Sequence, residues 1–428
     1  MPDPGSPRPD ERLVMVMIVR DEGDILEANL RYHHALGVDR FVVTDNGSVD
    51  ETAEILARYS DAGLVQVFDE SGADYNRNER AWLTRMARAA ATEQGADWVL
   101  YGDADEFWLP AEGSLREVLA SVPGRYGAVV APRTEYVGTP DGPGTFAERL
   151  TVREARSRVR PKLAHRAQPD LVAIDRGGHA VAVAGPTGNA ADTLRPPGRP
   201  IHRSVRDPDG DDSAEPVDER PLVWAPTWPV RILHFPVRSF AQFERRAQIA
   251  AGGDYPEGGR FDRLRQHHAE GRLDELYAEM ALEDDEVAEG IAAGRLVRDE
   301  RLRDLLSACP DPLAGAAPGS VRAELPEPER ERELADLEYD AMALLGRTEG
   351  WLVVQRNRNR ERIERLAKER GRLTRQRDRA RKKVEFLSGR LERRRRRAKA
   401  LKRRLRAERE RPWSRFRRTA RRLRRRPR

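Results

Sequence analysis

The chain has 428 residues, 35% of them charged, and a formal net charge of +6. Its single cysteine, Cys309, excludes an intrachain disulfide and a four-thiolate zinc site, and it fits a reducing compartment. No apolar run approaches the roughly 20 residues of a membrane span, and residues 1–12 lack the apolar core of a secretory signal. We therefore expect a cytoplasmic protein.

The small net charge hides an uneven distribution. Residues 351–428 contain 36 Lys or Arg and 8 Asp or Glu, a net charge of +28, whereas residues 1–350 contain 42 basic and 64 acidic residues, a net charge of −22. This pattern predicts an acidic globular part and a very basic tail that attracts an anionic partner. Trp413 and Phe416 favour an anionic membrane surface, with the protein peripheral at its inner face; nucleic acid is the alternative.

Strand and helix patterns alternate from residue 13 onward. The apolar run 13–19 predicts a strand buried on both faces, and apolar residues at helical spacing from Ile25 predict a helix that ends near Gly37. The alternation predicts an α/β fold with a mixed, mainly parallel sheet and helices on both faces. The same patterns predict strands at 40–44, 64–68, 98–101 and 127–131, and helices at 50–59, 77–94 and 114–121.

The second half of the chain shows weaker patterns. Residues 185–221, dense in Pro, Gly, Asp and Arg, predict an irregular insertion, and residues 230–235 predict a short strand. The expected organisation is a disordered N-terminus (1–12), an α/β domain (13–250), a helical extension (251–306), a linker (307–330), a helical and coiled-coil segment (331–411) and an Arg-rich basic tail (412–428).

A heptad pattern begins at Ile363 and continues without a slip. Ten of its thirteen a and d positions are apolar, the exceptions being Arg370, Arg377 and Arg394. This pattern predicts an α-helical coiled coil, and with it a homo-oligomer, that ends at Pro412.

The turn Asp103-Ala104-Asp105-Glu106 follows the predicted strand 98–101. Carboxylates at that position lie at the carboxyl end of a sheet, where open α/β folds bind ligands. Two hard oxygen ligands two residues apart suit Mg²⁺ or Mn²⁺, with a substrate diphosphate completing the shell. Alone, the same pattern is also that of an ordinary polar turn.

Two further strand ends belong to the same predicted edge. The strand 13–19 runs into Arg20-Asp21-Glu22, and the strand 40–44 runs into Asp45-Asn46-Gly47-Ser48. Asp45 can accept hydrogen bonds from a ribose or a base edge, Asn46 and Ser48 add polar contacts, and Gly47 permits a tight turn. Arg80, near the start of the predicted helix 77–94, is placed to face a phosphate.

Taken in order, these motifs resemble family 2-type glycosyltransferases with the GT-A fold, in a branch with an Asp-x-Asp-Glu-Phe signature that is similar to glycosyltransferase family 92. The resemblance begins at residue 13 and extends to about residue 250. Its downstream motifs are Arg160-Pro161-Lys162, Gly178-His179 and Leu233-His234-Phe235.

The resemblance implies transfer of a sugar from a nucleotide-sugar donor, of the UDP type, to a glycan or lipid-linked acceptor, with inversion and a divalent cation, Mn²⁺ or Mg²⁺. It implies that Asp103 and Asp105 bind the donor ribose and the metal, with His234 as a further metal ligand or else a core histidine. The donor-binding set it implies comprises Arg20, Glu22, Asp45, Asn46, Ser48, Arg80 and Asp103.

The catalytic base is left open. Inversion needs a carboxylate or similar group to take the acceptor proton, and the candidates are His179, Glu106, Glu135 and Asp175. Two other classes of protein compete with the enzyme: a non-catalytic coiled-coil scaffold with a degenerate nucleotide-binding domain, and a nucleic-acid-binding protein that acts through its tail.

Overall fold

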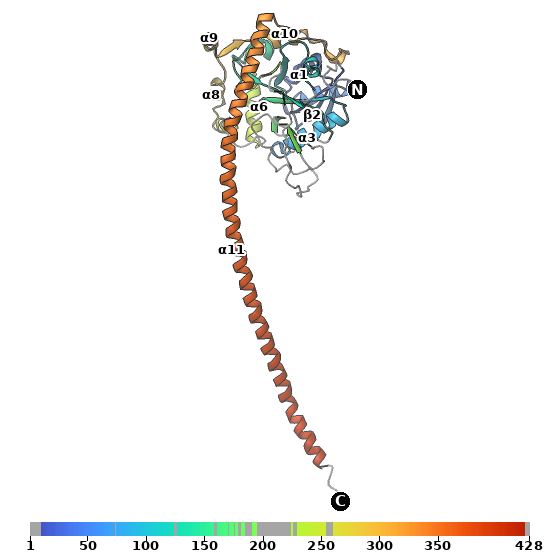
Figure 1. Ribbon diagram of the computed structural model, residues 1–428, viewed down its shortest axis with the longest axis vertical. Helices are drawn as coiled ribbons and strands as arrows, with labels where there is room; N and C mark the ends of the chain where they lie inside the picture. The colour runs from blue at the N-terminus through green and yellow to red at the C-terminus, as the bar shows by residue number, and fades with distance from the viewer. Residues whose placement is uncertain are drawn as a thin grey trace. The chain divides into compact units, whose positions relative to one another are not determined.

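We analysed a computed structural model of the chain, which describes residues 10–423 except 73, 124–125, 158–160, 170, 175, 179–180, 185–190, 195–223, 226–228 and 254–259. The chain divides into two compact units, Met1–Leu352 and Val353–Arg428. The first unit has an α/β fold with mixed sheets and many helices (Figure 1). The predicted fold class is therefore confirmed.

The main sheet places the predicted parallel strands side by side. Within the described residues its strand order is β13-β6-β9-β4-β1-β2-β3. Strands β1 to β4 run parallel in the order 3-2-1-4, so the order reverses between β1 and β4, which is where doubly wound sheets open a ligand crevice. The strands are β1 (Leu13–Val19), β2 (Arg40–Asp45), β3 (Val65–Asp69), β4 (Trp98–Tyr101), β6 (Ala128–Ala131), β9 (Lys162–Arg166) and β13 (Trp224–Ala225).

Helices cover both faces of this sheet. Alternate residues of β1 point to opposite faces, so the strand contributes to a core on each side. Leu13, Met15 and Met17 belong to the core beneath α1 (Leu26–Ala35) and α2 (Thr52–Asp61). Val14 and Val16 belong to a second core beneath α3 (Tyr75–Thr92). The continuous apolar run at 13–19 thus follows from burial on both faces.

The chain enters a second sheet directly after the Asp103–Asp105 turn. Its strand order within the described residues is β15-β8-β7-β14-β5, with β14 antiparallel to β5 and parallel to β7. This register puts His234, the last residue of β14, opposite both Glu106 and Glu135. The strands are β5 (Glu106–Pro110), β7 (Arg133–Val137), β8 (Val152–Glu154), β14 (Val230–His234) and β15 (Leu296–Arg298).

A third sheet joins β10 (Leu171–Ile174), β11 (Val181–Ala184) and β12 (Ala191–Leu194). Strand β12 falls within the predicted insertion 185–221, whose other residues lie outside the described part of the chain. The remaining elements are α4 (Leu115–Ala120), α5 (Phe146–Arg149), η1 (Arg176–Gly178), α6 (Phe240–Ala251), α7 (Arg260–Ala269), α8 (Leu273–Ala278), α9 (Asp284–Ala292), α10 (Arg301–Ala308), η2 (Pro312–Ala314) and α11 (Glu327–Leu423).

The segment predicted as a linker, 307–330, lies against the α/β core. Cys309 and Ala323 are buried there, and Ala323 forms a bridge with Gly113. The helix α11 that follows continues through Pro412 to Leu423, whereas the sequence predicts its end at the proline. Arginine, which dominates both sides of Pro412, is a strong helix former. Over the residues that the structure describes, we find no helix with the length and hydropathy needed to cross a membrane.

Buried ion pairs attach the beginning of α11 to the second sheet. Glu333 pairs with Arg231 of β14 at 2.7 Å and with Arg301 at 3.2 Å, and Asp340 pairs with Arg231 at 3.0 Å. Arg153 of β8 joins the group through Asp299, at 2.7 Å. We call Arg153, Arg231, Asp299, Arg301, Glu333 and Asp340 the anchor cluster.

Candidate functional site

The three predicted strand ends meet at one edge of the main sheet. Val19 pairs with Asp45 in the β1–β2 register, and Val16 pairs with Tyr101 in the β1–β4 register. The loops that leave β1, β2 and β4 therefore emerge together, on both sides of the point where the strand order reverses. This arrangement brings residues 20–22, 45–48 and 103–105 to one edge.

The loops after β1 and β2 are tied to each other through Asp45, Ser48 and Asp21. Asp45 Oδ1 accepts hydrogen bonds from the Ser48 amide at 3.0 Å and hydroxyl at 2.7 Å. The Asp21 amide donates to Ser48 Oγ at 3.0 Å, and Asp21 Oδ1 accepts from the Val49 amide at 2.7 Å. Asp21 has a φ of 54° and Gly47 a φ of 75°, both in the left-handed region that Asp, Asn and Gly tolerate best.

Arg238 links the first loop to the Asp-x-Asp turn, although the sequence patterns did not single it out. Its buried guanidinium pairs with Glu22 at 2.6 Å and Asp24 at 2.8 Å, and lies 3.7 Å from Asp105. Burial raises the pKa of Glu22 to about 7, against the opposing effect of Arg238. The signal in the sequence that could have identified Arg238 is its position four residues after His234, next to the Leu233-His234-Phe235 motif.

Asp103 and Glu106 share one buried lysine. Lys162 begins β9, which runs antiparallel beside β4, so its side chain reaches the turn that follows β4. Its Nζ lies 3.1 Å from Asp103 Oδ2 and 2.9 Å from Glu106 Oε2. The Asp103 side chain remains 52% exposed, whereas that of Glu106 is fully buried.

Glu106 is held on both carboxylate oxygens. Arg133 pairs with Oε1 at 2.5 Å, and Oε2 also accepts from the Asp103 amide at 2.9 Å. Burial by itself raises its pKa, but Lys162 and Arg133 lower the pKa of Glu106 to about 2. These contacts suit a carboxylate that fixes the turn, because a strongly paired and buried acid is a poor proton acceptor.

Asp105 is buried and surrounded by cationic groups. Its Oδ2 lies 3.2 Å from Arg246 Nη2 of α6 and 3.5 Å from His234 Nε2. Burial opposes ionisation, yet His234, Arg246 and Arg238 hold the pKa of Asp105 well below its usual range. His234 Nδ1 in turn lies 3.3 Å from Glu135, which is partly exposed.

The neighbouring residues of α6 contact two different motifs. Arg246 reaches Asp105, while Arg245 pairs with Asp50 Oδ2 at 2.7 Å. Ser239 begins α6 by accepting a hydrogen bond from the Gln242 amide at 3.1 Å, as its position before Phe240 predicts. Helix α6 therefore bridges the second loop and the Asp-x-Asp turn.

Asp105 and His234 are residue types that can ligate a divalent cation. His234 would have to lose a proton to do so, because Asp105 and Glu135 raise its pKa against the opposing effect of burial. The 3.5 Å between Asp105 Oδ2 and His234 Nε2 is compatible with two ligands of one ion. No group of three or more His, Cys, Asp or Glu side chains in the described part of the chain is arranged to hold a metal. Two protein ligands with the remaining positions left to phosphate oxygens is the usual arrangement for Mg²⁺.

The other predicted site residues lie near this edge or outside the described residues. Arg20 directly follows β1, Asn46 is buried in the second loop, and Arg80 lies in the second turn of α3. His179 and Asp175 fall outside the described residues. The adjoining Gly178, with a φ of 65°, packs so closely on Tyr101 that a Cβ would lie 2.4 Å from the Tyr101 Cβ.

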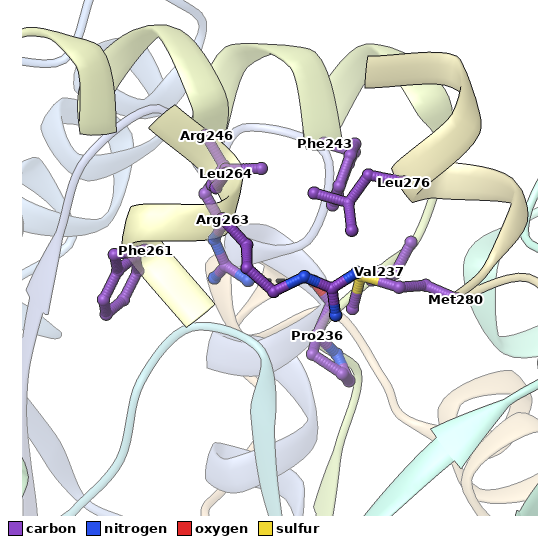
Figure 2. Close-up of a pocket in the computed structure, with 9 residues that line it drawn as sticks. All are labelled: Pro236, Val237, Phe243, Arg246, Phe261, Arg263, Leu264, Leu276 and Met280. Atoms are coloured by element: carbon purple, nitrogen blue, oxygen red, sulfur yellow. Dashed lines mark hydrogen bonds between the residues drawn. The ribbon is translucent and has the colours of Figure 1, made fainter. Parts of the chain in front are cut away.

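A pocket of about 180 Å³ opens beside Arg246 (Figure 2). The Arg246 guanidinium donates to the Pro236 carbonyl at 2.9 Å and to Asp105 at 3.2 Å, so it connects the pocket with the Asp-x-Asp turn. Arg263, drawn across the pocket in Figure 2, pairs with Glu279 at 2.6 Å. The lining residues are Pro236, Val237, Phe243, Arg246, Phe261, Arg263, Leu264, Leu276 and Met280.

Comparison with known proteins agrees with the motif-based resemblance. Residues 21–138 match the profile of glycosyltransferase family 92. A comparison with curated proteins found no match. The matched residues contain Asp21 and Glu22 of the first loop, the second loop and the Asp-x-Asp turn. The predicted resemblance is therefore confirmed there, and the enzyme class that it indicates is glycosyltransferase.

One solved structure similar to the chain is the fragment 1–349 of TarS from S. aureus, with 15% sequence identity and a TM-score of 0.24. The similarity covers 36% of this chain and 47% of the TarS chain. Another is glucosyl-3-phosphoglycerate synthase from Mycobacterium tuberculosis in complex with Mn²⁺, UDP and glucosyl-3-phosphoglycerate, with 19% sequence identity and a TM-score of 0.22. The similarity covers 29% of this chain and 44% of the synthase chain. The chain thus spans less than half the length of these two proteins.

Proposed function

We propose that the α/β unit is a metal-dependent, inverting glycosyltransferase that moves a sugar from a UDP-type donor to a hydroxyl group of a glycan or lipid-linked acceptor. The observation that carries the proposal is the meeting of the loops after β1, β2 and β4 where the strand order reverses. Asp45, Asp103 and Asp105 then lie at one edge, within a segment similar to family 92.

Each loop has a distinct proposed role toward the donor. Asp45 and Glu22 bind the nucleoside, with Arg20, Asn46, Ser48 and Arg80 completing the donor-binding set. The hydrogen bonds among Asp21, Asp45 and Ser48 support this role, because they hold the loops in place before the donor arrives. Asp103, which is half exposed beside Lys162, accepts from the donor ribose.

Asp105 and His234 would hold the divalent cation. When bound, Mn²⁺ or Mg²⁺ supplies Lewis-acid stabilisation of the departing diphosphate. Arg238 and Arg246 keep Asp105 ionised, and so keep it competent as a ligand, before any cation binds. Lys162 and Arg133 hold Glu106 so that the turn carrying Asp103 and Asp105 stays in one conformation.

We propose Glu135 as the base that removes the acceptor proton. Among the four candidates, Glu106 is buried and doubly paired, whereas Glu135 lies beside His234 with its side chain 26% exposed. A partly exposed carboxylate next to the donor edge can reach an incoming hydroxyl. Glu135→Gln should lower kcat by at least about 100-fold while the affinity for UDP changes little; an unchanged kcat would return the role to the residues near 175–179.

The pocket beside Arg246 is the proposed subsite for an apolar part of the acceptor. Its volume of about 180 Å³ is near that of a cavity, about 150 Å³, known to bind benzene, so it suits one ring or a short branched chain rather than a whole glycan. Met280→Trp at its rim should raise KM for benzyl glycosides and leave KM for the methyl glycosides unchanged. Equal changes for both acceptors would contradict this assignment.

The donor proposal is tested by calorimetric titration with UDP, with and without Mn²⁺. We expect metal-dependent binding that Asp105→Asn weakens at least about 10-fold, with Asp61→Asn, an exposed residue at the end of α2, as the matched control. Absence of UDP binding by the wild-type chain, repeated with GDP and dTDP, would refute the proposed function and favour a non-catalytic scaffold.

A further inference from the structure

The helical second unit exposes large apolar side chains at heptad positions. Leu373, Val384, Leu387, Leu391, Leu401 and Leu405 are each between 51% and 61% exposed. All six occupy a or d positions of the heptad that starts at Ile363. Exposed leucines that recur on one side of a helix need a partner, because water-exposed apolar area is unfavourable.

The rows that border this stripe are basic. Residues 390–409 contain twelve Lys or Arg and two Asp or Glu. Within them every e and g position that flanks the stripe is cationic and exposed. Of the two acidic residues, Glu392 lies at a b position, turned away from the stripe, and Glu408 lies at the d position that follows Leu405, at the end of the segment. The flanking residues are Arg390, Arg395, Arg397, Lys402, Arg404 and Arg409.

These flanks disfavour a second copy of the helix as the partner. In a two-stranded coiled coil, the e and g residues of one helix face those of the other, where stable pairs place opposite charges. Here every such contact between identical helices over 390–409 would bring cations together, and Arg394 would occupy a core d position. The heptad therefore does not pair well with itself in this segment.

We propose that the segment 384–409 of α11 lies on an anionic lipid bilayer. Its leucines would enter the boundary between headgroups and acyl chains, and the flanking Arg and Lys side chains would contact lipid phosphates. Nucleic acid would satisfy the charges through its phosphates but would leave the leucine stripe in water. The bilayer is the anionic partner that covers both features, and the inference does not depend on the chemistry of the first unit.

The test measures co-sedimentation of the full chain with vesicles of phosphatidylcholine and phosphatidylglycerol (3:1), and with phosphatidylcholine alone. The wild-type chain should bind only the anionic vesicles. The leucine variant, Leu391→Gln/Leu401→Gln/Leu405→Gln, keeps the charge and should bind at least about 10-fold more weakly.

Two charge variants provide a matched comparison, since each removes four cations from the same segment. The flank variant is Arg395→Gln/Arg397→Gln/Lys402→Gln/Arg404→Gln, and the outer-face variant is Arg396→Gln/Lys399→Gln/Arg403→Gln/Arg406→Gln. The flank variant should lose on the order of 1000-fold in vesicle affinity, from about 1 kcal/mol for each of four cations. The outer-face variant should lose several-fold less, because its residues point away from the surface.

Three results would overturn the proposal. One is equal vesicle binding by the wild-type and leucine variants. Another is tight poly(U) binding without vesicle binding, weakened equally by the two charge variants, which would identify a nucleic-acid surface. The third is a dimer in light scattering that the leucine variant dissociates, which would identify a coiled coil.

Discussion

Replacing Glu333 with glutamine removes one carboxylate from the buried anchor cluster. The wild-type cluster sets Asp299, Glu333 and Asp340 against Arg153, Arg231 and Arg301. Glu333 is 7% exposed and contacts the three arginines at 2.7, 3.2 and 3.5 Å. The variant leaves the buried guanidinium groups of Arg153 and Arg231 and the half-buried one of Arg301 with two carboxylates, one positive charge in excess.

We expect this change to lower the free energy of unfolding by about 3–5 kcal/mol, the typical cost of breaking a buried ion pair from one side. With a urea m-value of about 3 kcal/mol/M, the unfolding midpoint should fall by at least about 1 M. Glu331→Gln, an exposed residue in the same turn of α11, is the matched control and should shift it by less than about 0.2 M.

The assay is urea unfolding of the full chain, followed by tryptophan fluorescence, because Trp98 and Trp108 are buried in the α/β unit. Equal midpoints for Glu333→Gln and Glu331→Gln would refute the reasoning. Such a result would mean that the anchor cluster does not stabilise the first unit, and that the start of α11 detaches at little cost.

Three further predictions concern acid stability, the turn at Gly178 and the lysine beside Asp103. Against the effect of burial, Arg301 lowers the folded-state pKa of Asp299 and Arg231 lowers that of Glu333. The two carboxylates therefore stabilise the fold fully above about pH 5, and this stabilisation is lost as the pH falls through their folded-state pKa values. Urea midpoints should drop steeply below about pH 5, and less so in Glu333→Gln. Gly178→Ala should destabilise by more than Gly63→Ala, because both have φ near 65–69° but only Gly178 meets Tyr101, and an equal loss in thermal unfolding would contradict this. Lys162→Met should cost about 3 kcal/mol. Because Asp103 would lose this cation and Glu106 would keep only Arg133, the variant should also weaken UDP binding in calorimetry; unchanged values for both would refute the role of Lys162.

The sequence contains most of the information for the donor edge. The apolar run at 13–19 and its counterparts at β2 to β4 predict parallel strands, and the structure confirms their bounds within a residue or two. Burial on both faces, predicted for the run 13–19, is found for β1, whereas β3 at the sheet edge is only partly buried. Because parallel strands end at the same edge of a sheet, the polar residues that follow them must meet, and the sequence alone therefore groups Asp45, Asp103 and Asp105.

The surroundings of those residues could not be predicted in the same way. Strand β5 directly follows the Asp-x-Asp turn, yet no local pattern says that β14, more than 120 residues later, pairs with it and brings His234 opposite Glu106. Arg238 and Arg246 reach Asp105 only because this pairing directs α6 back across the site.

By itself, then, the sequence determined the class of fold, the three strand ends and the basic, leucine-striped helix, since each depends on local periodicity or on charge counted along the chain. Only the tertiary structure decided which cations hold Asp105, that Glu106 is sequestered while Glu135 is not, and that Glu333 and Asp340 fix the start of α11 to β14. The physical reason is that pairing between distant segments depends on which surfaces pack together, and burial and ion pairing follow from that packing.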